Sequence, residues 1–191
     1  MNDGPFDLRS ALVARGALLE GHFHLSSGRH SDRYVQKFRI LEDPALLEPV
    51  GRALAEEFRA LRPSVVVSAA VGGIPLGYEV ARHLGTKAIF MEKEDGVPVL
   101  RRGFRLSGED RALVVEDVVT TGQSVREVID VVRAAGAQVL GVGLIVARSR
   151  IDFSVPTRAL LDLPMESYEP DECPCCRAGD PLTDPGSRRL A

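Results

Sequence analysis

Short apolar runs alternate with helical segments through the middle of the chain, and this alternation limits the possible folds more than any other feature. The apolar runs are 65–70, 88–91, 112–115 and 139–147. Their β-branched composition is typical of strands buried on both faces. Helices are expected at about 75–84 and at 123–135, where Gly136 follows the second. Strands that alternate with helices predict an α/β fold with a parallel sheet flanked by helices.

The segments on either side of this region have weaker signals. A helix is expected to begin at Asp43 as the N-cap, with Pro44 in its first turn, and to end before Pro63. An N-terminal helix is expected over 6–19, followed by an extended, irregular segment over 20–40. Residues 92–110 are charged and contain glycines, which favours a mobile hairpin over a site, and 171–191 are expected to be a coil-like tail.

Composition and charge exclude several classes of protein. A chain of 191 residues with 45% hydrophobic residues is long enough for one buried core. A net charge of -3 argues against a protein that coats nucleic acid. Because no apolar run approaches the roughly 20 residues of a membrane span and the start of the chain lacks a signal-peptide pattern, we expect no membrane partner and a cytoplasmic location.

All three cysteines lie in one short segment, Cys173, Cys175 and Cys176. They cannot connect distant parts of the fold by disulfides. The C-x-x-C spacing is half of a structural zinc site, and the tails of two subunits together offer four thiolates. Free thiols in a turn are the favoured interpretation, because no second half of a zinc site is visible in the sequence.

The most informative segment is LVVEDVVTTGQS at 113–124, an apolar strand followed by two acids and a small, hydroxyl-rich turn. Ligands of open α/β sheets bind beyond the carboxyl ends of strands, where Glu116 and Asp117 are expected. Backbone N–H groups at the start of the next helix form an anion site, and Gly122 allows close approach. Carboxylates beside a phosphate site suit the hydroxyls of a phosphorylated sugar. The alternative is a capped helix beside two solvated acids.

This segment resembles the signature of the phosphoribosyltransferases, which implies a Rossmann-like core. By that resemblance the acidic pair contacts the ribose hydroxyls of phosphoribosyl pyrophosphate, residues 120–124 bind its 5-phosphate, and the cofactor Mg²⁺ is carried by its pyrophosphate. Gly72 and Gly73 correspond to the pyrophosphate loop. The resemblance thus assigns donor binding to Lys93, Gly72, Gly73, Glu116, Asp117, Val118, Val119, Thr120, Thr121, Gly122, Gln123 and Ser124.

A second segment narrows the resemblance to the orotate phosphoribosyltransferases. Residues 21–31, GHFHLSSGRHS, followed by Tyr34, are similar to the part of those enzymes that forms a hood over the base. Arg148 follows the last predicted strand, where a guanidinium suits the carboxylate of orotate. The resemblance assigns Thr120, Arg148, Ser27 and Tyr34 to orotate. A turn with surface histidines and a solvated loop arginine are the alternatives.

The chain departs from the family pattern at several cations. Many members carry a lysine where this chain has Ser26 and Gly72, and a later Lys and His in the loop 92–110 are missing. Lys93 matches one family lysine, and Arg101 and Arg102, with Arg105, are the replacement cations. Because arginine keeps its proton, its role is electrostatic. Lys93, Asp117, Arg101 and Arg102 are the predicted catalytic residues.

These observations predict a single domain with an N-terminal helix and hood over 1–40. An α/β core follows over 41–165, with a flexible loop at 92–110, and then a C-terminal tail over 166–191. The resemblance implies transfer of ribose 5-phosphate to orotate by a homodimer. Two alternatives remain at this point, a transferase for a purine base and a nucleotide-sensing regulator that has lost catalysis.

Overall fold

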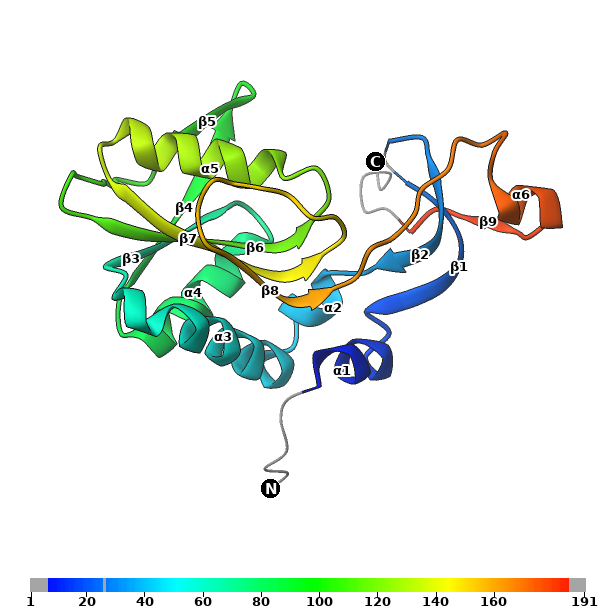
Figure 1. Ribbon diagram of the computed structural model, residues 1–191, viewed down its shortest axis with the longest axis horizontal. Helices are drawn as coiled ribbons and strands as arrows, with labels where there is room; N and C mark the ends of the chain where they lie inside the picture. The colour runs from blue at the N-terminus through cyan, green and yellow to red at the C-terminus, as the bar shows by residue number, and fades with distance from the viewer. Residues whose placement is uncertain (1–6, 26, 186–191) are drawn as a thin grey trace.

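A six-stranded sheet forms the centre of the protein (Figure 1). The computed structural model describes residues 7–25 and 27–185. The strands lie in the order β5 (Val97–Leu100), β4 (Lys87–Glu94), β3 (Val65–Ala69), β6 (Arg111–Val119), β7 (Gln138–Ala147) and β8 (Thr157–Asp162). All neighbouring strands are parallel except β4 and β5, which form an antiparallel hairpin. The predicted α/β fold with a parallel, helix-flanked sheet is confirmed.

Helices cover both faces of this sheet (Figure 1). On one face, α3 (Pro44–Phe58) and α4 (Gly73–Leu84) pack on Val66 and other strand side chains. On the other face, α5 (Gln123–Ala134) packs on Val65 and Val67. Successive β3 side chains therefore enter opposite cores, which explains the continuous apolar run in the sequence.

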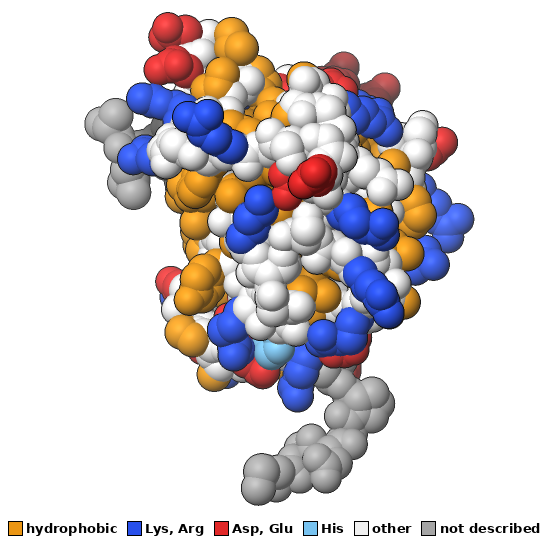
Figure 2. All heavy atoms as spheres, turned by 90° about the vertical axis from the view of Figure 1, so that its left-hand side faces the viewer, with side chains coloured by type: hydrophobic (Ala, Val, Ile, Leu, Met, Phe, Trp, Pro, Cys, Tyr) orange, Lys and Arg blue, Asp and Glu red, His pale blue; other side chains and the backbone are white. Residues whose placement is uncertain are grey.

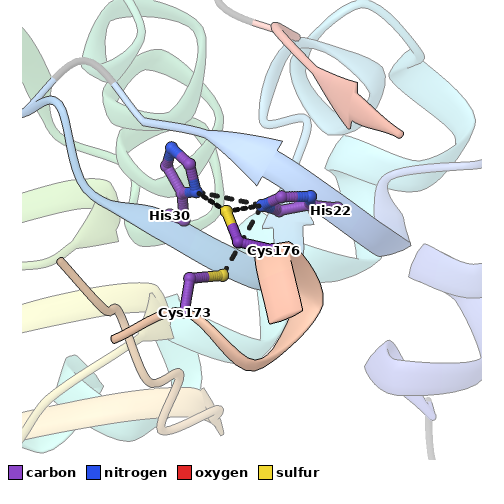
Figure 3. Close-up of side chains that lie close together, drawn as sticks. All are labelled: His22, His30, Cys173 and Cys176. Atoms are coloured by element: carbon purple, nitrogen blue, oxygen red, sulfur yellow. Dashed lines mark hydrogen bonds between the residues drawn. The ribbon is translucent and has the colours of Figure 1, made fainter. Parts of the chain in front are cut away.

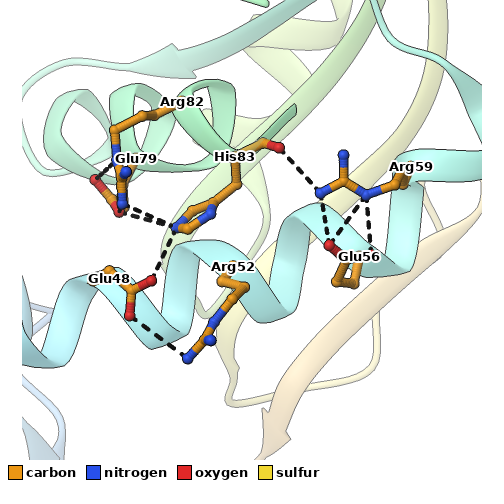
Figure 4. A network of polar contacts seen from close by, with 7 residues as sticks. All are labelled: Glu48, Arg52, Glu56, Arg59, Glu79, Arg82 and His83. Atoms are coloured by element: carbon orange, nitrogen blue, oxygen red, sulfur yellow. Dashed lines mark hydrogen bonds and ion pairs between the residues drawn. The ribbon is translucent and has the colours of Figure 1, made fainter. Parts of the chain in front are cut away.

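The two helices on the same face are also joined by a polar network (Figure 4). His83 Nε2 of α4 lies 3.1 Å from Glu79 Oε1 and 3.5 Å from Glu48 Oε1 of α3. The guanidinium of Arg59, in the short 3-10 helix η1 (Arg59–Leu61), donates to the backbone carbonyl of His83 at 3.0 Å. Exposed ion pairs add at most about 1 kcal/mol each, so the network supplements the apolar contact between the helices.

A second, three-stranded sheet stands beside the core and consists of β2 (His30–Val35), β1 (Leu18–His24) and β9 (Leu182–Thr183). We call this sheet the hood. Strands β1 and β2 are antiparallel, and β9 from the C-terminal tail pairs in parallel with β1. The short helix α6 (Pro174–Ala178) lies beside the hood, and α2 (Phe38–Leu41) connects the hood to the core (Figure 1).

Three expectations for the ends of the chain are wrong. The helix predicted over 6–19 is limited to α1 (Leu8–Ala14), because Gly16 takes a positive φ of 62° and β1 begins soon after. The segment 20–40, expected to be irregular, contains most of the hood hairpin. The tail, expected to be a coil, contains α6 and β9, because β1 offers an edge with which β9 pairs.

Figure 2 shows the end of the core that lies away from the hood. Lys and Arg side chains are distributed over this face and are interspersed with hydrophobic and acidic side chains. Among the described residues, no helix combines the length and the apolar character that a membrane crossing requires.

Candidate active site

The carboxyl ends of three neighbouring strands bring the predicted site segments together. Strands β3, β6 and β7 are adjacent and parallel, so the residues that follow them lie at one edge of the sheet. Gly72 follows β3, the turn Thr120 to Gly122 follows β6, and Arg148 follows β7. This edge faces the hood (Figure 1). It is the edge at which open α/β sheets bind ligands.

The two acids belong to β6 itself, which is longer than predicted. The strand continues to Val119 because its pairing with β7 continues to Ala147. Glu116 and Asp117 are therefore both buried, with 7% and 1% of their surface exposed. Burial, together with the neighbouring Asp117, raises the pKa of Glu116 to about 8. The raised pKa favours the protonated form of the Glu116 carboxyl, which can donate a hydrogen bond, unlike an ionised carboxylate.

The turn after β6 surrounds a hollow of about 140 Å³ at the start of α5. Gly122 has a φ of 76°, and a β-carbon there would lie 2.9 Å from the Phe153 ring. Glycine is therefore required at this position both by the backbone and by packing. The residues around the hollow are Glu116, Val118, Val119, Thr120, Thr121, Gly122, Gln123, Ser124 and Val125. A hollow at a helix N-terminus is suited to a phosphate group.

A larger cavity of about 670 Å³ lies between the hood and this turn. Ser27 and Tyr34 line it from the hood, and Thr120 and Arg148 line it from the core. Its volume is within the range of about 300–1,000 Å³ that is usual for small-molecule sites. The structure therefore brings the four residues assigned to the base into one cavity, while their role in binding stays a prediction.

Arg148 is the notable cation of this cavity. Its Nε is buried and has no hydrogen-bond partner among the described residues. Burial lowers the pKa of the guanidinium, which means that its surroundings disfavour the charged form. A half-buried guanidinium with an unpaired Nε is destabilising, and an anion in the cavity would relieve that cost.

Comparison with known proteins identifies the family. Residues 38–151 match the family described as phosphoribosyl transferase domain. The chain is 54% identical over 173 residues to the orotate phosphoribosyltransferase of Caldanaerobacter subterraneus subsp. tengcongensis, a match that covers 90% of this chain and 91% of that protein. The chain belongs to the orotate phosphoribosyltransferase family.

Two further comparisons agree with this assignment. The orotate phosphoribosyltransferase of Thermotoga petrophila is 48% identical over 185 residues, which is 96% of this chain and 99% of that protein. The crystal structure of orotate phosphoribosyltransferase from Aeropyrum pernix has a TM-score of 0.66 and 30% sequence identity, with 81% of this chain and 93% of that chain covered.

The cations predicted on the loop 92–110 are not gathered at the cavity. They lie on or beside the β4–β5 hairpin in exposed ion pairs: Lys93 with Glu127 at 2.9 Å, Arg101 with Glu94 at 3.5 Å, and Arg102 with Glu92 at 2.9 Å. None of the three lines the cavity between hood and turn. The hairpin expected over 92–110 instead consists of β4 and β5, and residues 101–110 follow it as turns and coil. The catalytic role of its cations stays a prediction.

Lys37 is a site residue that the sequence did not single out. Its Nζ forms an ion pair with Asp117 Oδ2 at 2.9 Å, and its side chain lines the cavity. A β-carbon on Gly72 would collide with the Asp117 carboxylate and lie 3.0 Å from Lys37 Nζ. Lys37 thus places a cation beside Gly72, where many family members carry a lysine. The position of Ser26, the other departure, lies outside the described residues.

One sequence signal could have pointed to Lys37, which is that lysine is rare in this chain. Lys37, Lys87 and Lys93 are the three lysines of the whole chain. The ion pair between Lys37 and Asp117 joins residues that are 80 positions apart. A contact of that kind depends on how the hood joins the core, which local patterns do not contain.

A hollow of similar size elsewhere lacks these features. It has a volume of about 710 Å³ and lies around Gly21 and Pro181, between β1 and the tail. Its lining includes no residue from the carboxyl ends of β3, β6 or β7. Chemistry therefore distinguishes the candidate active site better than volume does.

Proposed function

We propose that this protein transfers the ribose 5-phosphate group of phosphoribosyl pyrophosphate to orotate and releases pyrophosphate. The observation that carries the proposal is Arg148, a half-buried guanidinium with an unpaired, buried Nε, in a cavity that also adjoins the phosphate-sized turn. Orotate has a ring carboxylate, and a planar guanidinium can bind a carboxylate with two parallel hydrogen bonds. Ser27, Tyr34 and Thr120 line the same cavity and offer hydroxyl groups to the ring.

The donor occupies the turn and the acidic pair in this proposal. Backbone N–H groups of residues 120–124 bind the 5-phosphate. The ribose hydroxyls lie against Glu116 and Asp117, where the protonated Glu116 donates a hydrogen bond and Asp117 accepts one. The two acids can therefore hold two neighbouring hydroxyls in a fixed orientation, which aligns the ribose carbon with the base nitrogen.

The pyrophosphate lies at Gly72 and Gly73, where Lys37 contributes a positive charge. Oxygen donors are the ligands that Mg²⁺ prefers, and the Asp117 carboxylate beside Gly72 offers them. A Mg²⁺ ion held there would neutralise charge on the leaving group. Lys37 lies within reach of Gly72 and can exchange its ion pair with Asp117 for a pyrophosphate oxygen.

The reaction needs charge stabilisation more than proton transfer. We infer an oxocarbenium-like transition state at the ribose carbon, with the deprotonated base nitrogen as nucleophile. Lys37 and the hairpin cations Lys93, Arg101 and Arg102 stabilise the departing charge. For the hairpin to contribute, its exposed ion pairs must open and the hairpin must close over the donor, which also excludes water.

The proposed assembly is a homodimer in the cytoplasm. Val71 and Tyr78 are apolar or aromatic side chains with 70% and 66% of their surface exposed. Val71 precedes Gly72, and Tyr78 lies on α4, which begins at Gly73. A partner subunit that covers them would lie next to the donor site. Both proposed substrates are charged and do not cross membranes, which favours reaction in the compartment where they are made.

A substrate screen tests the proposal. The purified protein is incubated with phosphoribosyl pyrophosphate and Mg²⁺, with orotate, uracil, adenine, hypoxanthine or guanine offered separately, and pyrophosphate and nucleotide are measured. We expect turnover with orotate alone. Turnover only with a purine base would contradict the assignment of Arg148, and binding of substrates without turnover would favour a regulator.

A further inference from the structure

Two histidines of the hood and two cysteines of the tail converge on one point (Figure 3). His22 lies on β1, His30 begins β2, and Cys173 and Cys176 flank the first residues of α6. Their nearest ring nitrogens and sulfur atoms all lie within 4.8 Å of one another. His22, His30 and Cys173 are buried, whereas Cys176 is at the surface. Nothing in the proposed transfer reaction uses these four side chains.

Four of the six distances among these ligand atoms are close to the edges of a tetrahedron around one zinc ion, and all six are at most 4.8 Å. Zn–N bonds of about 2.05 Å and Zn–S bonds of about 2.3 Å imply about 3.4 Å between two nitrogens and about 3.6 Å between nitrogen and sulfur. Here His22 Nε2 and His30 Nδ1 are 3.0 Å apart. Cys176 Sγ lies 3.2 Å from His30 Nδ1 and 3.6 Å from His22 Nε2, and Cys173 Sγ lies 3.5 Å from His22 Nε2.

The surroundings orient the histidines for such a role. The Nδ1 of His22 lies 2.9 Å from the backbone carbonyl oxygen of Asp180, to which it can only donate. That hydrogen bond fixes the tautomer and leaves the lone pair of Nε2 directed at the cluster, as is usual for histidines that bind metals. The backbone of His30 exchanges two hydrogen bonds with Tyr168, at 2.8 and 2.9 Å, which holds β2 beside the tail.

We propose that His22, His30, Cys173 and Cys176 bind one structural Zn²⁺ ion within a single chain. Two neutral imidazoles and two thiolates balance the charge of the ion, and a tetrahedral set of two nitrogens and two sulfurs selects zinc among common metals. The half-site visible in the sequence is completed by the hood of the same subunit. The alternative of four thiolates from two tails is not needed.

The ion explains how such short tail elements stay folded. Helix α6 has 5 residues and β9 has 2, and neither length is stable on its own. A metal that joins α6 to β1 and β2 links segments about 150 positions apart. Because only the folded chain brings the four ligands together, the free energy of binding the ion adds directly to the stability of the fold.

The test is metal analysis of untagged protein, purified without chelators and with a reductant. We expect close to one zinc per chain by mass spectrometry of the metal. Replacing zinc with Co²⁺ should give the visible bands of a tetrahedral site and a thiolate charge-transfer band. Cys176→Ser and His22→Ala should lose the metal, whereas Cys175→Ser, the matched control outside the cluster, should keep it.

Alkylation of the wild-type protein gives a second readout that needs no variant. We expect iodoacetamide to modify Cys175 several-fold faster than Cys173 and Cys176, and a chelator to abolish that difference. Absence of stoichiometric metal after incubation with zinc and reductant would overturn the proposal. So would a disulfide between Cys173 and Cys176 in the isolated protein, or equal loss of zinc from Cys175→Ser and Cys176→Ser.

Discussion

At the scale of single residues, Arg148 carries the proposed choice of base. We predict that Arg148→Lys lowers kcat/KM for orotate by roughly 10- to 100-fold, because a lysine keeps the charge but loses the paired hydrogen bonds, worth about 1.5–3 kcal/mol. The KM for phosphoribosyl pyrophosphate should stay within about twofold of wild type, because the donor lies at other residues. Steady-state kinetics with each substrate varied in turn measures both effects.

Arg150→Lys is the control for this variant. Arg150 lies on the same loop but is exposed and lines a different hollow. The Arg150→Lys variant should keep kcat/KM for orotate and the KM for phosphoribosyl pyrophosphate near the wild-type values. Equal losses in the two variants would show that Arg148 acts only as one more loop cation.

Glu116 gives a prediction about stability and pH. Its pKa is about 8 in the folded protein against an ordinary value of 4.5, so the folded state holds this proton more tightly than the unfolded state does. Its favourable contribution is complete below pH 4.5 and declines as the pH rises towards 8. Glu116→Gln, which mimics the protonated acid, should remove that decline.

Denaturant unfolding at several pH values measures this effect. Between pH 5.5 and pH 8, wild type should lose on the order of 3 kcal/mol of unfolding free energy relative to Glu116→Gln. Taking the difference between the two proteins cancels the contributions of other titrating groups. Parallel pH profiles for the two proteins would contradict the raised pKa.

At the scale of elements, the turn between β6 and α5 depends on the absence of a side chain at Gly122. We predict that Gly122→Ala destabilises the protein by more than the roughly 1 kcal/mol expected of a positive φ alone. The additional cost comes from the close approach to Phe153. The variant should also raise the KM for phosphoribosyl pyrophosphate.

Gly85→Ala separates the two costs. Gly85 ends α4 with a similar φ of 71°, yet a β-carbon there meets nothing within 4 Å. The Gly85→Ala variant should lose only the stability expected from a positive φ, and its KM for phosphoribosyl pyrophosphate should be unchanged. If thermal unfolding gives the same Tm for both variants, packing at the turn contributes nothing.

The elements also show which parts of the fold could be predicted from sequence. The unit from β6 to α5 was predictable because its apolar run, its acids and its glycine lie within about twelve residues, and local patterning decides the structure there. β9 was not, because a two-residue strand exists only through its pairing with β1. The hood hairpin was also missed, since the histidines that point inward there are polar and disguise the alternation of a strand.

The residues of the candidate site also divide into those that could be predicted from the sequence and those that could not. Gly72, the turn at 120–122 and Arg148 were expected together because the carboxyl ends of parallel strands share one edge. The pair of Lys37 and Asp117 could not be expected, since it arises where the hood joins the core. The hairpin cations were predicted from the family resemblance, and in the structure they lie in exposed ion pairs away from the cavity.

At the scale of the whole molecule, subunit mixing tests whether the hairpin serves its own site or that of a partner. We predict that Lys93→Ala and Asp117→Ala are each inactive and that a mixture recovers activity. Random pairing makes half of the dimers mixed, each with one intact site, so about one quarter of the wild-type rate is expected. No recovery despite proven exchange of subunits would place each hairpin over its own site.

The hood is built from the two ends of the chain, with β1 and β2 near the start and β9 near the end. During synthesis, every strand of the large sheet therefore leaves the ribosome before β9 does. When residues 113–124 have been synthesised, the hood still lacks β9 and both cysteines of the cluster. The segments of the proposed donor site are therefore complete earlier in the life of the chain than the cover over the proposed base cavity.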